Sequence, residues 1–156
     1  MIPFLQKHYV NNSDGLFDDG INEAFNLIRN FEYNPKLENI SDYKNKLLDS
    51  FSNSGFVMKY SLGSTNLSIN GIKSDVGLQI QLGNAARFYA DMVKLQWLYD
   101  ENIISAAIYI CFTKSSARES YASNLVSMER CLNELVLFQN ILTLPVLVIG
   151  LDFVDR

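Results

Sequence analysis

The chain has 156 residues, of which 48% are hydrophobic and 19% charged, and its formal net charge is −4. This length predicts a single domain with its own core, and the composition excludes an intrinsically disordered chain. The negative balance argues against a nonspecific nucleic-acid binder, which usually carries a clear excess of basic residues.

The charge is unevenly distributed along the chain. Residues 1–50 hold five basic and eight acidic residues, whereas residues 55–118 hold six basic and four acidic ones. Contact with a polyanion is therefore expected in the middle of the chain. No apolar run is long enough to span a bilayer, and the N-terminus lacks the basic start and sustained apolar stretch of a signal peptide. We expect a cytoplasmic protein without a membrane partner.

The first 54 residues predict a helical N-terminal part with two helices. One helix follows the turn cluster at residues 12–15 and carries an apolar stripe that includes Phe25 and Ile28. The second starts near Ser41, a suitable N-cap residue, and ends before Gly55.

The pattern changes to short β-type runs after Gly55. Three runs, at residues 56–62, 67–72 and 76–82, are separated by turn residues and predict an antiparallel meander. The third run alternates, because residues 76, 78, 80 and 82 are aliphatic while residues 77, 79 and 81 are Gly, Gln and Gln.

The remaining chain alternates between helix and strand. We predict a helix over residues 85–99, an apolar strand over 103–112, a helix over 121–142 and a buried strand over 146–149. Such a pattern is typical of right-handed crossovers in a sheet covered by helices. The predicted fold class is α/β, a mixed β-sheet with an antiparallel meander followed by β-α-β-α-β and flanked by helices. Residues 55–152 form the core of this one domain, which spans residues 1–156.

Both long predicted helices are apolar over more than one face. A helix that lies on a sheet needs only one apolar stripe, so the second stripe must be buried elsewhere. We interpret this as a symmetric homodimer formed through a helical bundle. The alternative is that the two helices pack side by side in a monomer.

The segment from Ser68 to Asn84 carries the pattern most relevant to chemistry. It predicts a hairpin whose second strand places Gln79 and Gln81 on one face and leads through Gly83 into a helix. The alternative is that the two glutamines are simply the solvated face of a half-buried strand.

Several motifs in one order connect this hairpin to a known family. Residues 66–152 resemble the core of the BglII/BamHI type of type II restriction endonucleases, which have the PD-(D/E)XK nuclease fold. The motifs are Gln79-Ile-Gln81-Leu-Gly-Asn84, Asp91-Met-Val-Lys94-Leu-Gln, the strand 103–110 leading to Thr113-Lys114, the helix start Ser123-Asn124, and the closing Pro145-Val-Leu-Val-Ile-Gly-Leu-Asp152.

The resemblance implies a catalytic site whose acidic residues have been replaced. BglII-like members have Asp, eight residues, Glu, one residue and Gln, and that spacing falls here on Asn70, Gln79 and Gln81. The two carboxylates of the family hold Mg²⁺, a hard cation that requires oxygen ligands and negative charge. Asp75 lies too close to Gln79 in the chain to replace the first carboxylate. We therefore expect no metal site and no catalysis in this sequence, although a version with acidic residues implies Mg²⁺.

Two origins are compatible with the amides. Asn and Gln are the substitutions chosen to inactivate a nuclease without changing its shape, and single-base changes also produce them in a protein kept for another purpose. The sequence does not distinguish the two.

The resemblance also implies contacts with double-stranded DNA. Gly83, Asn84, Ser123 and Asn124 match recognition positions, and an Asn side chain is a bidentate partner for an adenine edge. Candidate phosphate contacts are Arg87, Lys94, Lys114 and Arg118. The alternative for each basic residue is an ordinary solvated surface charge.

Two functions of different classes follow. The first is a type II restriction-endonuclease-like DNA-binding protein that is inactive as written, with a cognate DNA methyltransferase as a further partner. The second is a non-enzymatic homodimeric interaction or regulatory module that retains the nuclease fold without cleaving DNA.

Overall fold

A computed structural model describes residues 1–11, 15, 18–34, 37–119 and 124–153 of the chain. Its strands form one six-stranded sheet in the order β1-β6-β5-β4-β3-β2. The strands are β1 (Phe4–Val10), β2 (Val57–Ser61), β3 (Ser68–Lys73), β4 (Val76–Ile80), β5 (Ala106–Phe112) and β6 (Val146–Asp152). The helices are α1 (Asp18–Arg29), α2 (Ile40–Asn53), α3 (Arg87–Asp100), α4 (Lys114–Glu119) and α5 (Met128–Leu137).

The sheet is mixed, as the sequence predicts. Strands β2, β3 and β4 form an antiparallel meander, and β4, β5 and β6 are parallel to one another. The reversal between β3 and β4 contains Ser74, whose positive φ of 53° fits a tight turn. Helix α3 connects β4 to β5, and α4 and α5 lie between β5 and β6.

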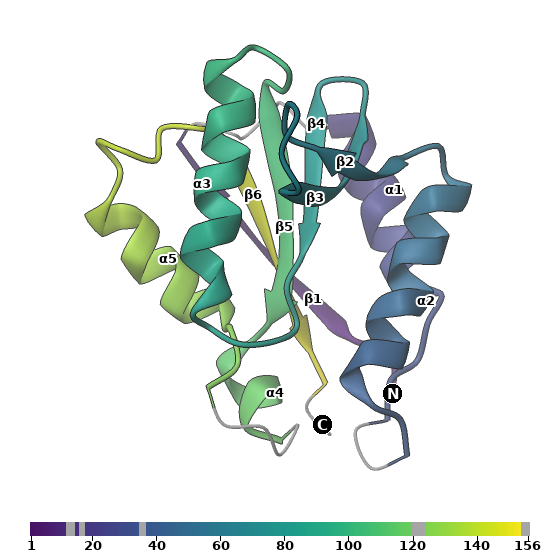
Figure 1. Cartoon of the computed structure of the whole chain (residues 1–156). Coiled ribbons are helices and arrows are strands. Elements are labelled where there is room, and N and C mark those ends of the chain that lie inside the picture. The colour runs from purple at the N-terminus through teal and green to yellow at the C-terminus, as the bar shows by residue number, and fades with distance from the viewer. Residues whose placement is uncertain (12–14, 16–17, 35–36, 120–123, 154–156) are drawn as a thin grey trace.

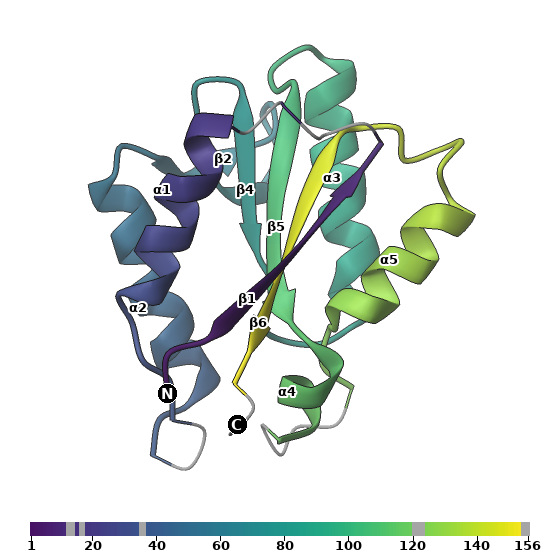
Figure 2. The same ribbon diagram turned by 180° about the vertical axis from the view of Figure 1, so that it is seen from behind.

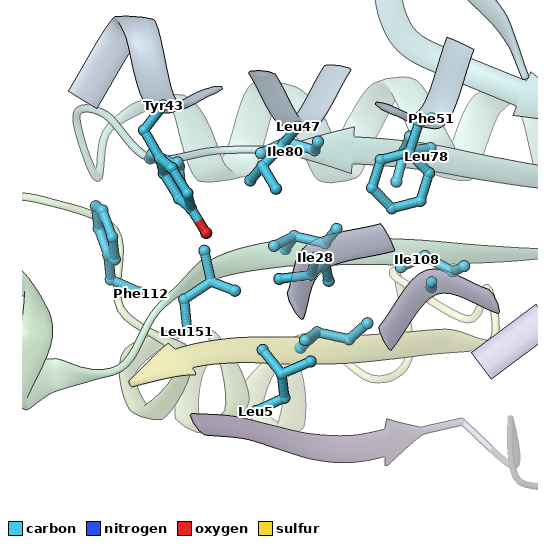
Figure 3. Close-up of a cluster of buried hydrophobic side chains, with 14 of the residues drawn as sticks. Leu5, Ile28, Tyr43, Leu47, Phe51, Leu78, Ile80, Ile108, Phe112 and Leu151 are labelled. Atoms are coloured by element: carbon cyan, nitrogen blue, oxygen red, sulfur yellow. The ribbon is translucent and has the colours of Figure 1, made fainter. Parts of the chain in front are cut away.

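Helices cover both faces of the sheet. In Figure 1 the pair α3 and α5 lies on one side and the pair α1 and α2 on the other, and Figure 2 shows the same layers from behind. Each interface between sheet and helices has its own apolar cluster. Figure 3 shows the cluster beneath α1 and α2, in which Tyr43, Leu47 and Phe51 of α2 point toward Leu78 and Ile80 of β4. Burial of strand residues on both faces explains the nearly continuous apolar sequence of β5 and β6.

The prediction of a purely helical N-terminal part is wrong. The two expected helices are present, but residues 4–10 form strand β1, which pairs antiparallel with β6 at the edge of the sheet. Most side chains of β1 are exposed or half-buried, and Leu5 is buried in the core. An edge strand with so little buried surface has no clear apolar alternation, and the sequence Phe-Leu-Gln-Lys-His-Tyr-Val therefore did not indicate it.

The predicted helix over residues 121–142 is also too long. Helix α5 spans only Met128–Leu137, and residues 121–123 lie outside the described part. Asn124 has a positive φ of 66°, and Leu125 and Ser127 form isolated β-bridges with Asn84 and Phe112. The apolar residues before α5 thus cover the end of the sheet in extended conformation, which periodicity alone does not distinguish from helix.

Smaller differences concern the element boundaries. Asn39, not Ser41, caps α2, because its side-chain oxygen accepts a hydrogen bond from the Asp42 N–H at 2.8 Å. Helix α3 begins at Arg87 rather than at residue 85. No helix in the described part of the chain is long and apolar enough to cross a membrane.

Candidate functional site

Strands β3 and β4 separate at Asn70 and Gln79. The last pair of residues in the β3–β4 ladder on this side is Gly71 with Leu78. Beyond it, side chains take over the hydrogen bonds: the Asn70 N–H donates to Gln79 Oε1 at 3.0 Å, and the Ile80 N–H donates to Asn70 Oδ1 at 2.7 Å. The two positions that the family spacing selects are therefore adjacent across the hairpin.

A buried carboxylate lies directly behind this hairpin. Asp91 of α3 is only 3% exposed, and its two oxygens accept hydrogen bonds from Gln79 Nε2 at 2.9 Å and Gln81 Nε2 at 2.8 Å. The Lys94 ammonium lies 3.1 Å from Asp91 Oδ1, and the Tyr109 hydroxyl makes a longer contact of 3.4 Å with Oδ2. We call these five residues the Asp91 network. Its donors compensate a charge that would otherwise be costly to bury.

Local structure explains why the network forms. Gln79 and Gln81 lie on the face of β4 opposite to Leu78 and Ile80, which pack in the cluster beneath α2. The glutamines thus face α3, which follows β4 after a short connection. Asp91 and Lys94 are three residues apart on α3 and share a helix face.

The partners fix the orientation of each amide. The nitrogens of Gln79 and Gln81 meet a carboxylate, which only accepts, while the oxygens of Asn70, Gln79 and Gln81 each accept from a backbone N–H. For the two glutamines, exchanging oxygen and nitrogen would place like groups against each other at both ends of the amide. The site therefore presents N–H groups, not oxygens, toward its interior.

This arrangement does not fit a Mg²⁺ site. Mg²⁺ requires oxygen ligands with negative charge, but the amides at positions 70 and 79 are neutral and their oxygens already accept backbone hydrogen bonds. The one carboxylate of the network is balanced by Lys94. In the described residues, no group of three or more His, Cys, Asp or Glu side chains is placed to hold a metal ion.

Sequence reasoning missed Asp91 and Tyr109 as members of the site. Asp91 is the acidic residue among the buried side chains of α3, which include Phe88 and Leu95 one turn before and after it, and that isolation was a usable signal. Tyr109 gives no such signal because it lies inside a continuous apolar strand. Burial, followed by the nearby Asp91 charge, raises the pKa of the Tyr109 hydroxyl far above its ordinary value.

The predicted recognition positions lie close together at the carboxyl ends of the parallel strands. Asn84 forms a β-bridge with Leu125, and Asn124 Nδ2 donates to Asn84 Oδ1 at 3.3 Å. The Val126 N–H donates to the Gly83 carbonyl at 2.9 Å. Asn84 and Asn124 are both exposed, whereas Ser123 lies outside the described residues.

The predicted phosphate contacts have different surroundings. Arg87 and Lys114 are exposed, at the first positions of α3 and α4. The Lys94 ammonium donates to the Ser68 carbonyl at 2.9 Å in addition to pairing with Asp91. Arg118 lies in α4, but its side chain is outside the described part.

A further cation near the site comes from the acidic N-terminal segment. Lys44 of α2 interacts electrostatically with Asp91, Arg87 and Lys94. Burial lowers the pKa of Lys44, the Asp91 carboxylate opposes this shift, and the two cations add to it. The charge distribution along the sequence gave no indication of this residue.

Comparisons with known proteins agree with this fold. A crystal structure of the restriction endonuclease BglII complexed with a DNA 16-mer is similar, with a TM-score of 0.83 and 13% sequence identity, covering 98% of this chain and 78% of that one. No curated protein matches the chain by sequence. The family model for the restriction endonucleases BglII and BglIII matches residues 14–151. Because that match spans most of the chain, the protein belongs to the BglII/BglIII restriction endonuclease family.

Proposed function

We propose that this chain is a type II restriction-endonuclease-like protein that binds double-stranded DNA and does not cleave it. Membership of the family and the likeness to a nuclease solved with DNA support binding. The β3–β4 hairpin supports the lack of cleavage, because it holds the neutral amides of Asn70 and Gln79 where the family places metal ligands. We further propose a single domain over residues 1–156, a cytoplasmic location, and a cognate DNA methyltransferase as a partner of the system.

The energetic argument concerns charge. Two carboxylates in a Mg²⁺ site compensate the cation and position it beside the phosphate. Replacing both with amides removes two negative charges, and the lost transition-state stabilisation amounts to several powers of ten in rate. Mg²⁺ therefore belongs to an acidic version of the site and not to the present one.

We assign base contacts to the exposed loop cluster that contains Gly83, Asn84 and Asn124, together with Ser123. An Asn side chain there pairs with an adenine edge in the major groove. The phosphate contacts are Arg87, Lys94, Lys114 and Arg118, all from the part of the chain with excess positive charge.

The protein itself is expected to bind but not to cut. Incubation with plasmid DNA and either Mg²⁺ or Mn²⁺ should leave the plasmid intact, and selection from a random duplex pool at low salt should enrich one sequence. Discrete, sequence-specific bands contradict the proposed inactivity. Failure to enrich any sequence removes the recognition proposal and favours the second function.

That second function is a non-enzymatic homodimeric interaction or regulatory module. Exposed apolar side chains on two neighbouring helices favour an interface between two copies. Tyr89, Val93 and Trp97 follow one another at four-residue intervals on α3 and are 39%, 62% and 39% exposed. The Tyr89 ring packs against Phe138 at 5.9 Å, next to the exposed Val136, Leu137 and Ile141. We assign this α3–α5 surface to a symmetric dimer, which is compatible with either function.

A charge at the centre of the α3–α5 surface should prevent dimer formation. The protein is expected to sediment as a dimer at tens of micromolar, whereas Val93→Glu should sediment as a monomer because the carboxylate would be buried without a partner. Val57→Glu is the matched control, since Val57 is also 62% exposed but lies on the edge strand β2. A protein that remains monomeric without either substitution rejects this interface.

A further inference from the structure

Lys59 has an unusual backbone conformation for its place in the fold. Its φ is 52°, and it lies in the middle of β2. Among the described residues other than glycine, Lys59 alone has a positive φ inside a strand or helix, because the others, Asn11, Ser74, Asn102 and Asn124, lie between elements. A left-handed backbone strains a side chain such as Lys and persists only where the surrounding structure holds it. Such strain is concentrated at functional sites, so the surroundings of Lys59 are informative.

Lys59 lies opposite Asn70, and the sheet is interrupted there on both sides of β3. The β2–β3 ladder pairs residue 58 with 71 and residue 60 with 69, but it skips Lys59 and Asn70. The β3–β4 ladder ends with Gly71 and Leu78 and does not include Asn70. Asn70 is thus the one residue of β3 that belongs to neither ladder.

The interruption is a bend and not an inserted residue. The register is the same on both sides of Lys59, whereas a β-bulge would shift it by one. Beyond the bend, α3 holds the start of β3: the Ser68 carbonyl accepts a hydrogen bond from Lys94 Nζ at 2.9 Å, and Ile69 is buried in the cluster beneath α3. In Figure 1, β2 runs across the direction of β4. The left-handed residue therefore lets β2 follow β3 away from β4.

This bend makes Asn70 available to the site. The Asn70 N–H donates to Gln79 Oε1 at 3.0 Å, and Asn70 Oδ1 accepts from the Ile80 N–H at 2.7 Å. In a flat sheet the same register would continue, and Asn70 and Gln79 would pair through their main chains. The separation of the strands thus gives the two side chains their present partners.

We propose that Lys59 is a positioning residue of the Asn70–Gln79 pair: its left-handed backbone holds β2 in the bend that keeps Asn70 out of both ladders. The Lys59 side chain is exposed, so the role belongs to the backbone conformation and not to the ammonium group. This inference rests on the proposed assignment of positions 70 and 79 as former metal positions. It implies that an acidic version of the site requires the same bend.

Two substitutions at position 59 separate the backbone from the side chain. Lys59→Val should relax toward an extended conformation, because a β-branched residue strongly disfavours a positive φ. Lys59→Gly removes the same ammonium group but tolerates the bend. The readout is hydrogen exchange of the Ile80 N–H, which Asn70 Oδ1 protects. We expect about tenfold faster exchange in Lys59→Val, the effect of losing one hydrogen bond, and the parent rate in Lys59→Gly.

Ser74→Val is the matched control. Ser74 has nearly the same φ, 53°, but lies in the turn at the other end of the β3–β4 hairpin. This control should lower Tm about as much as Lys59→Val and leave the Ile80 N–H at the parent rate. If Lys59→Val does not fold, Lys59→Thr replaces it as a smaller β-branched change. Parent-like exchange in the folded β-branched variant, or equal acceleration in Lys59→Gly or Ser74→Val, refutes the positioning role.

A second arm adds the same substitutions to the variant with restored carboxylates, Asn70→Asp with Gln79→Glu. Adding Lys59→Val should weaken Mn²⁺ binding about ten- to hundredfold, as expected when the support of a metal ligand is lost, whereas adding Lys59→Gly should not. If Mn²⁺ binds equally well with Lys59→Val, the positioning role is refuted while the family assignment stands. If the restored protein with Lys59 intact binds no Mn²⁺, the assignment of the metal positions fails, and exchange of the Ile80 N–H still decides the role of Lys59.

Discussion

Restoring the two carboxylates, Asn70→Asp with Gln79→Glu, is expected to give a protein that binds Mn²⁺ and cuts duplex DNA. The two positions are already adjacent, because the Asn70 N–H reaches the Gln79 side chain at 3.0 Å. The third family position, Gln81, is unchanged. The gain in rate over the parent should be several powers of ten, since the lost stabilisation is that of a charged metal site.

The restored protein should also become dependent on the cation for stability. Gln79 Nε2 now donates to Asp91 Oδ1 at 2.9 Å, and a Glu in its place would set two carboxylates against each other in a buried position. In EDTA we expect a lower Tm than that of the parent, and added Mn²⁺ should recover the loss. Calorimetric titration with Mn²⁺ and thermal unfolding measure this separately from cleavage.

A matched control separates the site from the added charge. Asn70→Asp with Gln81→Glu introduces the same two charges, and the new Glu also faces Asp91, at the position where Gln81 Nε2 lies 2.8 Å from Oδ2. The carboxylate of this Glu does not replace the Gln79 side chain, which is the group that meets Asn70. The control variant should therefore be destabilised in EDTA, but it should neither bind Mn²⁺ nor cut DNA. If both double variants fold and neither binds Mn²⁺, the family spacing has been assigned to the wrong residues.

The parts of the fold with strong periodicity were predictable. Alternation over residues 76–82 predicted β4 and the face that carries Gln79 and Gln81, and the apolar runs predicted β5 and β6. These signals are strong because burial on one or both faces requires apolar residues at fixed intervals. The spacing of Asn70 and Gln79 was sufficient to predict their adjacency once the hairpin was recognised.

The elements that depend on distant partners were not predictable. Strand β1 exists because β6 offers an edge, and the segment before α5 is extended because Asn84 and Phe112 pair with it. Asp91 joins the site only because α3 packs against β4, a contact that a single sequence does not encode locally. Lys44 was overlooked for a similar reason: counting charges by segment does not reveal which charges interact in the folded chain.

The Asp91 network should matter more for stability than its polar composition suggests. Asp91→Asn keeps the shape of the side chain but replaces one oxygen with an N–H group, which then meets the N–H group of Gln79 or Gln81. It also leaves Lys94, only 18% exposed, without its counterion. Breaking a buried pair in this way costs about 3–5 kcal/mol, which corresponds to roughly 10 °C in Tm for a chain of this size.

Two companion variants identify the cause of that loss. Asp100→Asn is the control on the same helix, because Asp100 is exposed and accepts a single hydrogen bond from Gln96, so its effect should stay below about 1 kcal/mol. Adding Lys94→Met to Asp91→Asn should recover part of the stability, since the unpaired buried charge is then removed. Urea unfolding measures all of these variants. An Asp91→Asn protein as stable as the parent would show that the amides do not depend on this carboxylate for their hydrogen bonding. It would also contradict the electrostatic explanation given for the inactive site.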